Sequence, residues 1–463
     1  MNDTEINLGR ARLNEEQAEF PNINTHSPKH LNTFSVCLRP KILIAMSPVS
    51  CGIDFGTSNS SVAIANKGSV TLVPVERDQV TIPSAIFFPG HGYHPVFGRA
   101  AVQLFFDRKD GRFMRSLKRV LGTQLMNHGT LINGKSVKFE RIIGSFLENL
   151  RARTNAFAAV EIENVVMGRP VHFVDNDPDA DIKAQQELRA IAKHVGYKYI
   201  EFQFEPIAAA FAHEVKIEGE KLAIVADLGG GTSDFTVIRL SGKYVAKADR
   251  SSDILANTGV RVGGNDFDRD LSLALIMPEI GYLSTYGKKH LEVPLKYFHD
   301  LAEWSKVNFL YTPKVLSQVR QFFHESHDKK RFGRLLTILE QERGHSLLAV
   351  AEETKIGLTG ASSYAAQFDF LEGGLTLPVD RKQFENAIEN EVQKISQAAT
   401  ECLKKASVRE RDIELVILTG GSTEIPLVQA AFKKLFPYAA VADENKLSSV
   451  GLGLAYDCRK KFG

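Results

Sequence analysis

The sequence has few of the residues on which disulfide frameworks and metal clusters depend. Its 4 cysteines, Cys37, Cys51, Cys402 and Cys458, are far apart, and none belongs to a CxxC pair. This spacing argues against a disulfide framework or a cysteine-bound metal and favours a reducing, cytoplasmic compartment. The 13 histidines are scattered as well. We interpret His172, which follows a strand-like run, as a packed or solvated side chain rather than a ligand.

The chain also lacks long apolar runs and an excess of charge. No run approaches the roughly 20 residues of a membrane span. The 57 basic and 55 acidic residues leave a net charge of +2. We therefore expect neither a membrane nor a nucleic acid as a partner. With 463 residues, 43% hydrophobic and 24% charged, the composition is typical of a soluble globular protein with two or more domains.

The first 45 residues differ from the rest because they are polar and show no sustained period. We interpret residues 1–45 as a disordered extension. A signal peptide is poorly supported, since the apolar run at 41–45 is too short and acidic residues precede it. Translation that starts at Met46 is an alternative, and mass spectrometry of the native N-terminus would distinguish the two.

What the sequence does contain is two small-residue turns, each opened by an aspartate and set between strand-like runs. They are Asp54-Phe55-Gly56-Thr57-Ser58-Asn59 and Asp227-Leu228-Gly229-Gly230-Gly231-Thr232-Ser233-Asp234. Strand, turn and strand predict a β-hairpin. Glycine lets the backbone approach phosphate oxygens closely, and the aspartate can hold a divalent cation through water. Two such turns indicate two related halves that close on one nucleotide.

The remaining pattern alternates strands and helices. The stretch from 270 to 355 is charged, mainly helical and contains Trp304, the only tryptophan, so we interpret it as an inserted subdomain. Periodicity predicts strands at 164–171, 199–204 and 415–418, and helices at 101–106, 113–121, 142–154, 181–194, 207–214, 385–406 and 427–436.

Six motifs occur in an order that resembles the actin-like ATPase superfamily, most closely the nucleotide-binding half of the heat shock protein 70 (DnaK-like) family. Within that family the chain is similar to the YegD-type members. The motifs are Asp-Phe-Gly-Thr at 54–57, Gly-Arg-Pro at 168–170, Glu-Pro-Ile-Ala-Ala at 205–209, Asp-Leu-Gly-Gly-Gly-Thr at 227–232, Gly-Gly-Asn-Asp-Phe-Asp at 263–268 and Thr-Gly-Gly-Ser-Thr-Glu-Ile-Pro at 419–426.

The resemblance implies an α/β fold with two lobes, each built on a ribonuclease-H-like sheet, with inserted subdomains. ATP or ADP and Mg²⁺ are expected in the cleft between the lobes. We expect lobe I at 51–221 and lobe II at 222–463, with the inserted helical subdomain at about 270–355. Because the sequence ends at Gly463, we also expect no peptide-binding domain.

The same resemblance assigns roles to individual residues. Asp54 and Asp227 would orient magnesium through its waters. Glu205 would position the attacking water, with Asp234 as a second carboxylate and Thr232 in the catalytic set. The implied nucleotide-binding residues are Gly56, Thr57, Ser58, Asn59, Gly229, Gly230, Gly231, Thr232, Gly263, Gly264, Lys355, Gly420, Gly421 and Ser422.

One departure from the family pattern concerns catalysis. The family's catalytic lysine is expected in the segment after Phe97, where this chain has Val102. Arg99, Arg115 and Lys118 are alternatives for its role.

Other departures concern the nucleoside. The two arginines that hold adenine in the family are replaced by Ile356 and Glu424, which cannot supply guanidinium stacking. Asn265 replaces the acid that contacts the ribose, and Leu447 stands where the family often has aspartate. These changes predict altered nucleotide affinity or base preference.

Together these features predict an ATP-binding, chaperone-like protein that hydrolyses ATP slowly and has protein partners or cochaperones. A non-hydrolysing nucleotide sensor or scaffold and a filament-forming actin-like protein are alternatives. A sugar or acetate kinase ranks last, because its substrate-side base could only be Glu205 or Asp234.

Overall fold

The computed structural model describes residues 49–91, 94–107, 109–174, 177–247, 249–442 and 448–463. The extension expected at 1–45, the alternative start at Met46 and Leu447 lie outside the described residues. None of the helices in the described ranges combines the length and the apolar character that a membrane crossing requires.

A six-stranded sheet is built around the first hairpin. Its strands are β1 Ser50–Phe55, β2 Asn59–Ala65, β3 Val70–Leu72, β4 Thr81–Pro83, β10 Asn164–Arg169 and β11 Tyr199–Phe204. They run in the order β11-β10-β1-β2-β3, and β4 pairs with β2 off this path. On one side of β1 the pairings are antiparallel, whereas on the other side β10 and β11 continue the sheet in parallel.

A five-stranded sheet around the second hairpin repeats this topology. Its strands are β12 Lys221–Leu228, β13 Ser233–Leu240, β14 Ile254–Val260, β19 Leu415–Thr419 and β20 Ala440–Ala442. Antiparallel pairs lie on one side of β12 and parallel pairs on the other. The two halves are therefore related, as the two turns predicted. We call the half with the first sheet lobe I and the half with the second sheet lobe II.

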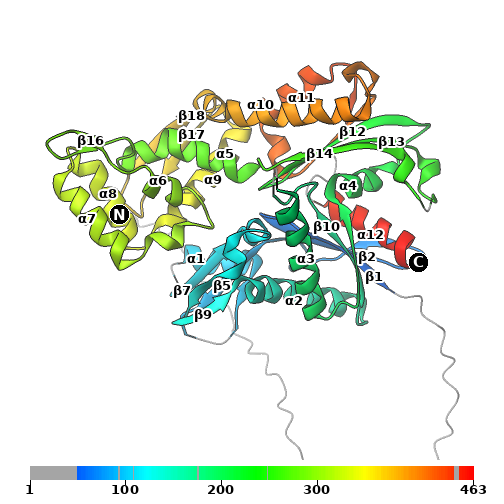
Figure 1. Cartoon of the computed structure of the whole chain (residues 1–463), viewed down its shortest axis with the longest axis horizontal. Helices are drawn as coiled ribbons and strands as arrows, with labels where there is room; N and C mark the ends of the chain where they lie inside the picture. The colour runs from blue at the N-terminus through cyan, green and yellow to red at the C-terminus, as the bar shows by residue number, and fades with distance from the viewer. Residues whose placement is uncertain (1–48, 92–93, 108, 175–176, 248, 443–447) are drawn as a thin grey trace, which may run out of the picture. The chain divides into compact units, whose positions relative to one another are not determined.

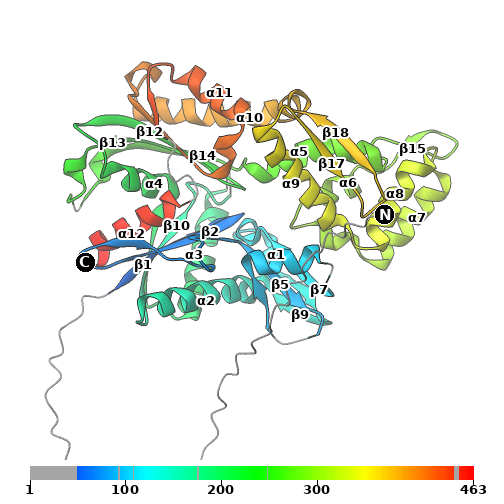
Figure 2. The ribbon, with the colours of Figure 1, turned by 180° about the vertical axis from the view of Figure 1, so that it is seen from behind.

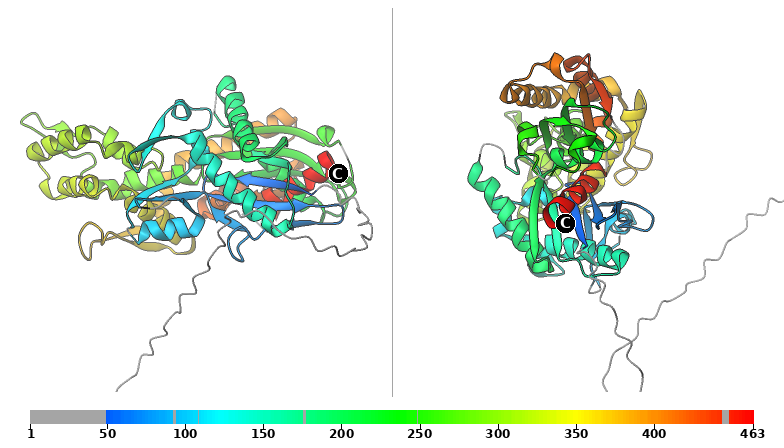
Figure 3. Two further views of the ribbon diagram at one scale, coloured as in Figure 1. Left: turned by 90° about the horizontal axis from the view of Figure 1, so that it is seen from below. Right: turned by 90° about the vertical axis from the view of Figure 1, so that its right-hand side faces the viewer.

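Two helices lie between the sheets, α4 Glu205–Glu214 and α12 Ser449–Phe462 (Figure 1). Helix α12 packs against α4 and against β1, β2 and β10. The right-hand view of Figure 3 shows α12, in red, between the blue strands and the green strands. Buried residues of both helices join residues of both sheets, such as Ala63 and Ala223, in one apolar cluster. A shared core therefore supports both lobes.

Other helices cover the remaining faces of the sheets. In lobe I, α2 Phe139–Ala158 packs against α3 Pro178–Val195, and both share an apolar cluster with β1. In lobe II, α10 Arg381–Ala406 packs against β13, β14 and α11 Pro426–Leu435 (Figure 2). The structure confirms the helices expected in these regions.

The predicted helix at 113–121 is wrong. Strand β7 Gly111–Arg115 pairs with β5 Ala85–Pro89, and a 3-10 turn, η1 Leu117–Val120, follows. Between them Ser116 has φ 59°, a left-handed conformation that ends the strand and cannot continue a helix. The pairing with β5 is a tertiary contact, which local periodicity does not report.

Two smaller sheets and a helix complete the outer part of lobe I. They contain β6 Val96–Phe97, α1 Gly98–Phe106, β8 Gly129–Ile132 and β9 Lys135–Lys138. Strand β6 joins β5 and β7, and β8 and β9 form a hairpin.

The outer part of lobe II is mainly helical, with two hairpins. Its elements are α5 Gly264–Leu271, the π-helical turn η5 Ser272–Ile276, β15 Thr285–Tyr286, β16 Leu291–Glu292, α6 Lys296–Leu301, α7 Pro313–Glu325, α8 Lys329–Glu340, α9 Gly344–Gly360, β17 Ser363–Gln367 and β18 Thr376–Asp380. Helix α9 packs against α5 and β17 and carries residues of the site described next.

Candidate functional site

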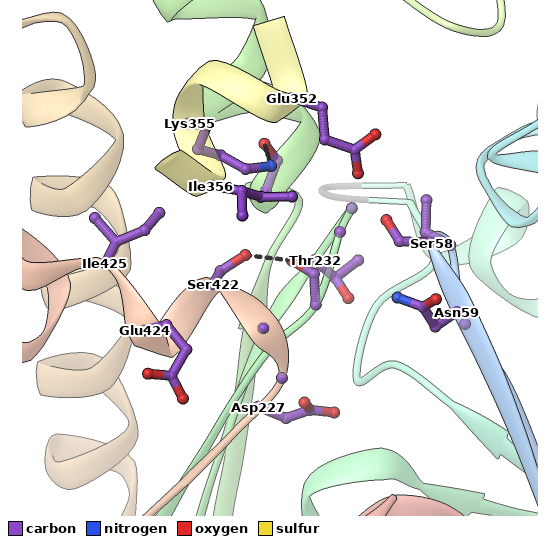
Figure 4. Close-up of a pocket in the computed structure, with 18 of the residues that line it drawn as sticks. Ser58, Asn59, Asp227, Thr232, Glu352, Lys355, Ile356, Ser422, Glu424 and Ile425 are labelled. Carbon is purple, nitrogen blue, oxygen red and sulfur yellow. Dashed lines mark hydrogen bonds between the residues drawn. The ribbon is translucent and has the colours of Figure 1, made fainter. Parts of the chain in front are cut away.

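A cavity of about 420 Å³ lies between the turns of the two hairpins. Figure 4 shows side chains of α9 on one side of it and Ser58 and Asn59 of the first turn on the other. Its lining contains Asp54, Gly56, Thr57, Ser58, Asn59, Glu205, Asp227, Gly229, Gly230, Gly231, Thr232, Gly264, Lys355, Gly420, Gly421 and Ser422. These are all of the residues expected at the site except Gly263 and Asp234.

The two turns approach each other so closely that a side chain has no room at one contact. A Cβ built on Gly230 would lie 2.1 Å from Oγ of Ser58. A Cβ built on Gly231 would lie 2.9 Å from Oγ1 of Thr57. Glycine is therefore needed at these positions because the two turns meet there, and not because of the fold of either hairpin alone.

Hydrogen bonds hold both turns in shape. The Ser84 hydroxyl donates to the carbonyl of Gly56 at 2.7 Å. In the second turn the Gly229 N–H donates to the carbonyl of Thr232 at 2.9 Å, and the Ser422 hydroxyl donates to the carbonyl of Gly229 at 3.0 Å. Turns of this kind present backbone N–H groups to a cavity and form a concave site for anions such as phosphate.

The start of helix α5 is joined to the second turn. The Gly264 N–H donates to the carbonyl of Gly229 at 3.0 Å, and the Asn265 N–H donates to the carbonyl of Gly230 at 2.8 Å. Gly263 lies behind the turn rather than in the cavity lining. It therefore supports the turn that faces the cavity.

We expect Gly263→Ala to distort the second turn. The new Cβ would lie 2.6 Å from the backbone nitrogen of Gly231, and backbone atoms cannot give way cheaply. The expected result is at least about tenfold weaker nucleotide binding, equivalent to about 1.4 kcal/mol, by isothermal titration. Gly373→Ala is the control, because a Cβ there meets nothing within 4 Å. Equal affinity in the two variants would contradict the supporting role.

Asp54, Glu205 and Asp227 form the acidic floor of the cavity, and burial raises the pKa of the two aspartates. Asp227 and Glu205 are buried, and Asp54 is half-buried. Burial, together with the neighbouring Glu205 carboxylate, raises the pKa of Asp54 to about 7 and the pKa of Asp227 well above its ordinary value. The cavity floor is therefore a concentrated acidic site that favours either protons or a cation.

Asp234 is fully buried directly behind this floor. Its Oδ1 accepts a hydrogen bond from the Val171 N–H at 2.7 Å, whereas Oδ2 has no hydrogen-bond partner. Burial, and then the Glu205 carboxylate, raise the pKa of Asp234 to about 8. Asp234 therefore adds to the acidic field of the site without lining the cavity.

Lys118 provides the cation of the cavity floor. It lies in η1, only 7% of its side chain is exposed, and its Nζ pairs with Oε1 of Glu205. Burial alone would lower the pKa of Lys118, but the carboxylates of Glu205, Asp54 and Asp234 outweigh burial and raise it. A charged lysine therefore faces the space between the two turns.

Position 102, where the family's lysine is expected, does not face the cavity. Val102 lies in α1, packs against the apolar core and does not line the cavity. Of the three alternatives, Arg99 pairs with Glu76 and Arg115 pairs with Glu352, whereas Lys118 lines the cavity.

Helix α9 forms one wall of the cavity. Lys355 Nζ lies 2.8 Å from Oδ1 of Asp268 and donates to the carbonyl of Gly264 at 3.2 Å. Burial raises the pKa of Asp268 to about 6 even though Lys355 opposes this shift. Ile356 is 61% exposed and lines the cavity together with Glu424, so no arginine stands at either position (Figure 4).

The acidic floor suits a hydrated cation better than a directly coordinated one. Among the described residues, no three His, Cys, Asp or Glu side chains are grouped so that they could hold a metal ion. Mg²⁺ in phosphate sites commonly keeps several waters and uses one or two carboxylates. Asp54 and Asp227 fit that role, because a cation would relieve the cost of their buried charge. His172 is exposed, as its solvated interpretation predicts.

A family model for the Hsp70 protein matches residues 50–279 and 318–460. The chain belongs to the Hsp70 family. The predicted actin-like ATPase fold is thereby confirmed, and Hsp70 membership implies ATP-binding, chaperone-like function. Hsp70 proteins generally bind ATP or ADP with Mg²⁺ and usually bind cochaperones or substrates. Residues 280–317, which include Trp304, lie outside the match.

Sequence reasoning did not identify every residue at this Hsp70-family site. Glu352 lines the cavity, and Asp268 lies against Lys355, but neither had been assigned a role. The Glu-Glu-Thr-Lys run at 352–355 offered a signal for Glu352, because residues three apart share one face of a helix. Lys118 was named only as one of three alternatives, because the helix predicted at 113–121 gave no signal that singled it out.

Proposed function

We propose that the cleft binds Mg-ATP between the two hairpin turns and that the protein hydrolyses it slowly, as a chaperone-like protein of the YegD type. The observation that carries the proposal is the meeting of two glycine-containing turns over a floor of Asp54, Asp227, Glu205 and Lys118. Backbone N–H groups there suit phosphate, and the carboxylates suit a cation. The Hsp70-family match favours this proposal over the filament-forming and kinase alternatives.

In this proposal the residues act by positioning and by charge neutralisation. A bound Mg²⁺ would supply charge stabilisation on the phosphates, with Asp54 and Asp227 orienting its waters. Glu205 would orient the attacking water, and Lys118 would face the phosphoryl oxygens. Thr57, Ser58 and Asn59 would contact phosphate from lobe I, and Gly229, Gly230, Gly231 and Thr232 from lobe II.

The pairing of Lys118 with Glu205 gives a reason for slow turnover. Each side chain neutralises the other, so neither is fully available to the phosphate or to the water. This observation also favours a second candidate function, a nucleotide sensor that binds ATP without hydrolysing it. Ile356 and Glu424 support weak selection of the base, since neither can stack on it as a guanidinium does.

We also propose lobe boundaries at 51–221 and 222–463, with an inserted subdomain at about 270–355. Helix α12 belongs to the second range of residues but packs on the sheet of lobe I, so the two lobes share it. We further propose that the protein acts with protein partners.

Isothermal titration with ATP, ADP and GTP in the presence of Mg²⁺, with phosphate release measured on the same sample, tests the function. We expect magnesium-dependent binding, weakened at least about tenfold in Asp227→Ala, which corresponds to about 1.4 kcal/mol. Glu205→Gln is expected to retain binding and lose phosphate release. Asp179→Asn is the matched control, since Asp179 is an exposed carboxylate at the start of α3.

The possible results separate the two candidate functions. Binding together with phosphate release supports the ATPase. Binding without release in the parent protein supports the sensor. An absence of binding would overturn the assignment of the cleft and leave only the fold.

A further inference from the structure

Lys118 is carried by a short segment, residues 115–120, which contains the end of β7, Ser116 and η1. Within it Ser116 has φ 59°, in the left-handed region that non-glycine residues rarely adopt. Such a conformation persists where surrounding contacts impose it. The partners of this segment therefore determine where the Lys118 side chain points.

Lobe II contacts the segment on both sides of Lys118. Nδ2 of Asn265, in α5, donates to Oγ of Ser116 at 3.1 Å. A guanidinium nitrogen of Arg261 donates to the carbonyl of Arg119 at 2.8 Å. These bonds anchor the side chain of Ser116, two residues before the lysine, and the carbonyl of Arg119, the residue after it. Asn265, which stands at the expected ribose-contacting position, does not line the cavity.

Arg115, at the start of the segment, has its partners in lobe II as well. Its guanidinium pairs with both carboxylate oxygens of Glu352 in α9, one contact being 2.8 Å between NH2 and Oε1. It also lies over the ring of Trp304, 5.2 Å from the centroid. The side chains of Arg115 and Glu352 are only 13% and 21% exposed. Trp304 belongs to the region that the family match does not cover.

The tip of Lys118 and the segment that carries it have their partners in different lobes. Nζ pairs with Glu205, which begins α4 in lobe I. The segment around the lysine is bound from lobe II. Asn265 of α5 and Glu352 of α9 contact the side chains of Ser116 and Arg115, and Arg261, just after β14, donates to the carbonyl of Arg119. Separation of the lobes would therefore remove the contacts that orient the segment while leaving Glu205 in place.

We propose that Asn265, Arg261 and Glu352 are positioning residues that hold Lys118 in the cleft from the opposite lobe. Lys118 is then correctly placed only while the lobes are closed. Any effect on hydrolysis rests on the proposed function. The placement of Lys118 itself does not, so the two can fail separately.

Amine footprinting tests the placement without nucleotide. The full-length protein is exposed briefly to an amine-acylating reagent, and mass spectrometry of peptides gives the labelling rate of Lys118. Ser116→Ala and Asn265→Ala remove the same interlobe hydrogen bond, one from lobe I and the other from lobe II. Glu352→Gln weakens the ion pair with Arg115. Glu340→Gln is the matched control, because Glu340 pairs with Arg320 in an exposed contact away from the segment.

We expect Lys118 to be labelled at least about fivefold faster in Asn265→Ala and in Glu352→Gln than in the parent and in Glu340→Gln. Lys460, which is half-buried over the ring of Phe211 and away from the segment, should keep its rate, which separates this effect from general unfolding. The emission of Trp304, which is 8% exposed, should shift to longer wavelength in the same variants. Unchanged labelling of Lys118 in folded Ser116→Ala, Asn265→Ala and Glu352→Gln would overturn the proposal.

If ATP is hydrolysed, kcat should fall in Ser116→Ala and Asn265→Ala with little change in KM, because neither residue lines the cavity and the turns that bind phosphate are untouched. Faster labelling without measurable hydrolysis in the parent would support the placement and contradict only the ATPase function. A rise in KM with unchanged labelling would instead show a direct role in nucleotide binding and contradict the positioning role.

Discussion

Lys118→Met is expected to lower the rate of phosphate release by about 100-fold or more, the scale on which removal of a preorganised charge acts. It is also expected to destabilise the protein by about 3–5 kcal/mol, because Glu205 would remain buried without its partner. Asp54 lies in the same field and would lose a neighbouring positive charge. Phosphate release and urea unfolding measure the two effects separately.

A second substitution separates catalysis from folding. The double variant Lys118→Met, Glu205→Gln removes both the positive and the negative charge of the buried pair. Most of the stability lost in Lys118→Met should therefore return. Phosphate release should not return, because the groups proposed to face the phosphoryl oxygens and the attacking water are both changed. Lys183→Met is the control, since Lys183 pairs with Glu187 at the surface and should change neither quantity. Stability unchanged in Lys118→Met would show that the pair with Glu205 is not formed in solution.

The second large effect is a fall in the stability of the nucleotide-free protein as pH rises from about 5.5 to 8. The pKa of Asp54 is raised to about 7 and that of Asp234 to about 8, whereas both lie near 3.8 in the unfolded chain. The folded state therefore holds more protons than the unfolded state between these values. Stability decreases with rising pH by about 1.4 kcal/mol per pH unit for each such group, until its folded pKa is passed.

Urea unfolding across this pH range measures the effect. Asp54→Asn should flatten the decline below about pH 7, because one of the titrating groups is removed. Asp179→Asn should follow the parent. Mg²⁺ should stabilise the protein more at pH 8 than at pH 6, since carboxylates that have lost their protons bind the cation. A stability that rises between pH 6 and 8 would contradict the buried, protonated state of these carboxylates.

Much of the site could be predicted because the phosphate-binding turns depend on residues that are adjacent in the sequence. The turns after Asp54 and Asp227 need small residues for the backbone to reach a phosphate, and alternating apolar residues flank them. Such patterns depend on neighbours along the chain. The structure places both turns at one cavity, with Glu205 and Lys355 in its lining.

The errors arose where distant contacts decide the local conformation. Residues 111–115 have no strong strand pattern, and they form β7 because β5 offers a partner. Ser116 takes a left-handed conformation among its contacts with lobe II, which ends the expected helix. Lys118 therefore reaches the cavity from a segment whose periodicity predicted something else.

The sequence by itself determined the two hairpins, the acidic residues that open their turns and the order of elements that resembles the actin-like ATPases. Only the tertiary structure decided that Lys118, and not position 102, faces the cavity, and that Asn265 contacts Ser116 rather than the cavity. The physical reason is that a turn is specified by the torsion preferences and hydrogen bonds of adjacent residues. The position of a side chain between two lobes depends instead on packing and charge contributed by segments far away in the chain.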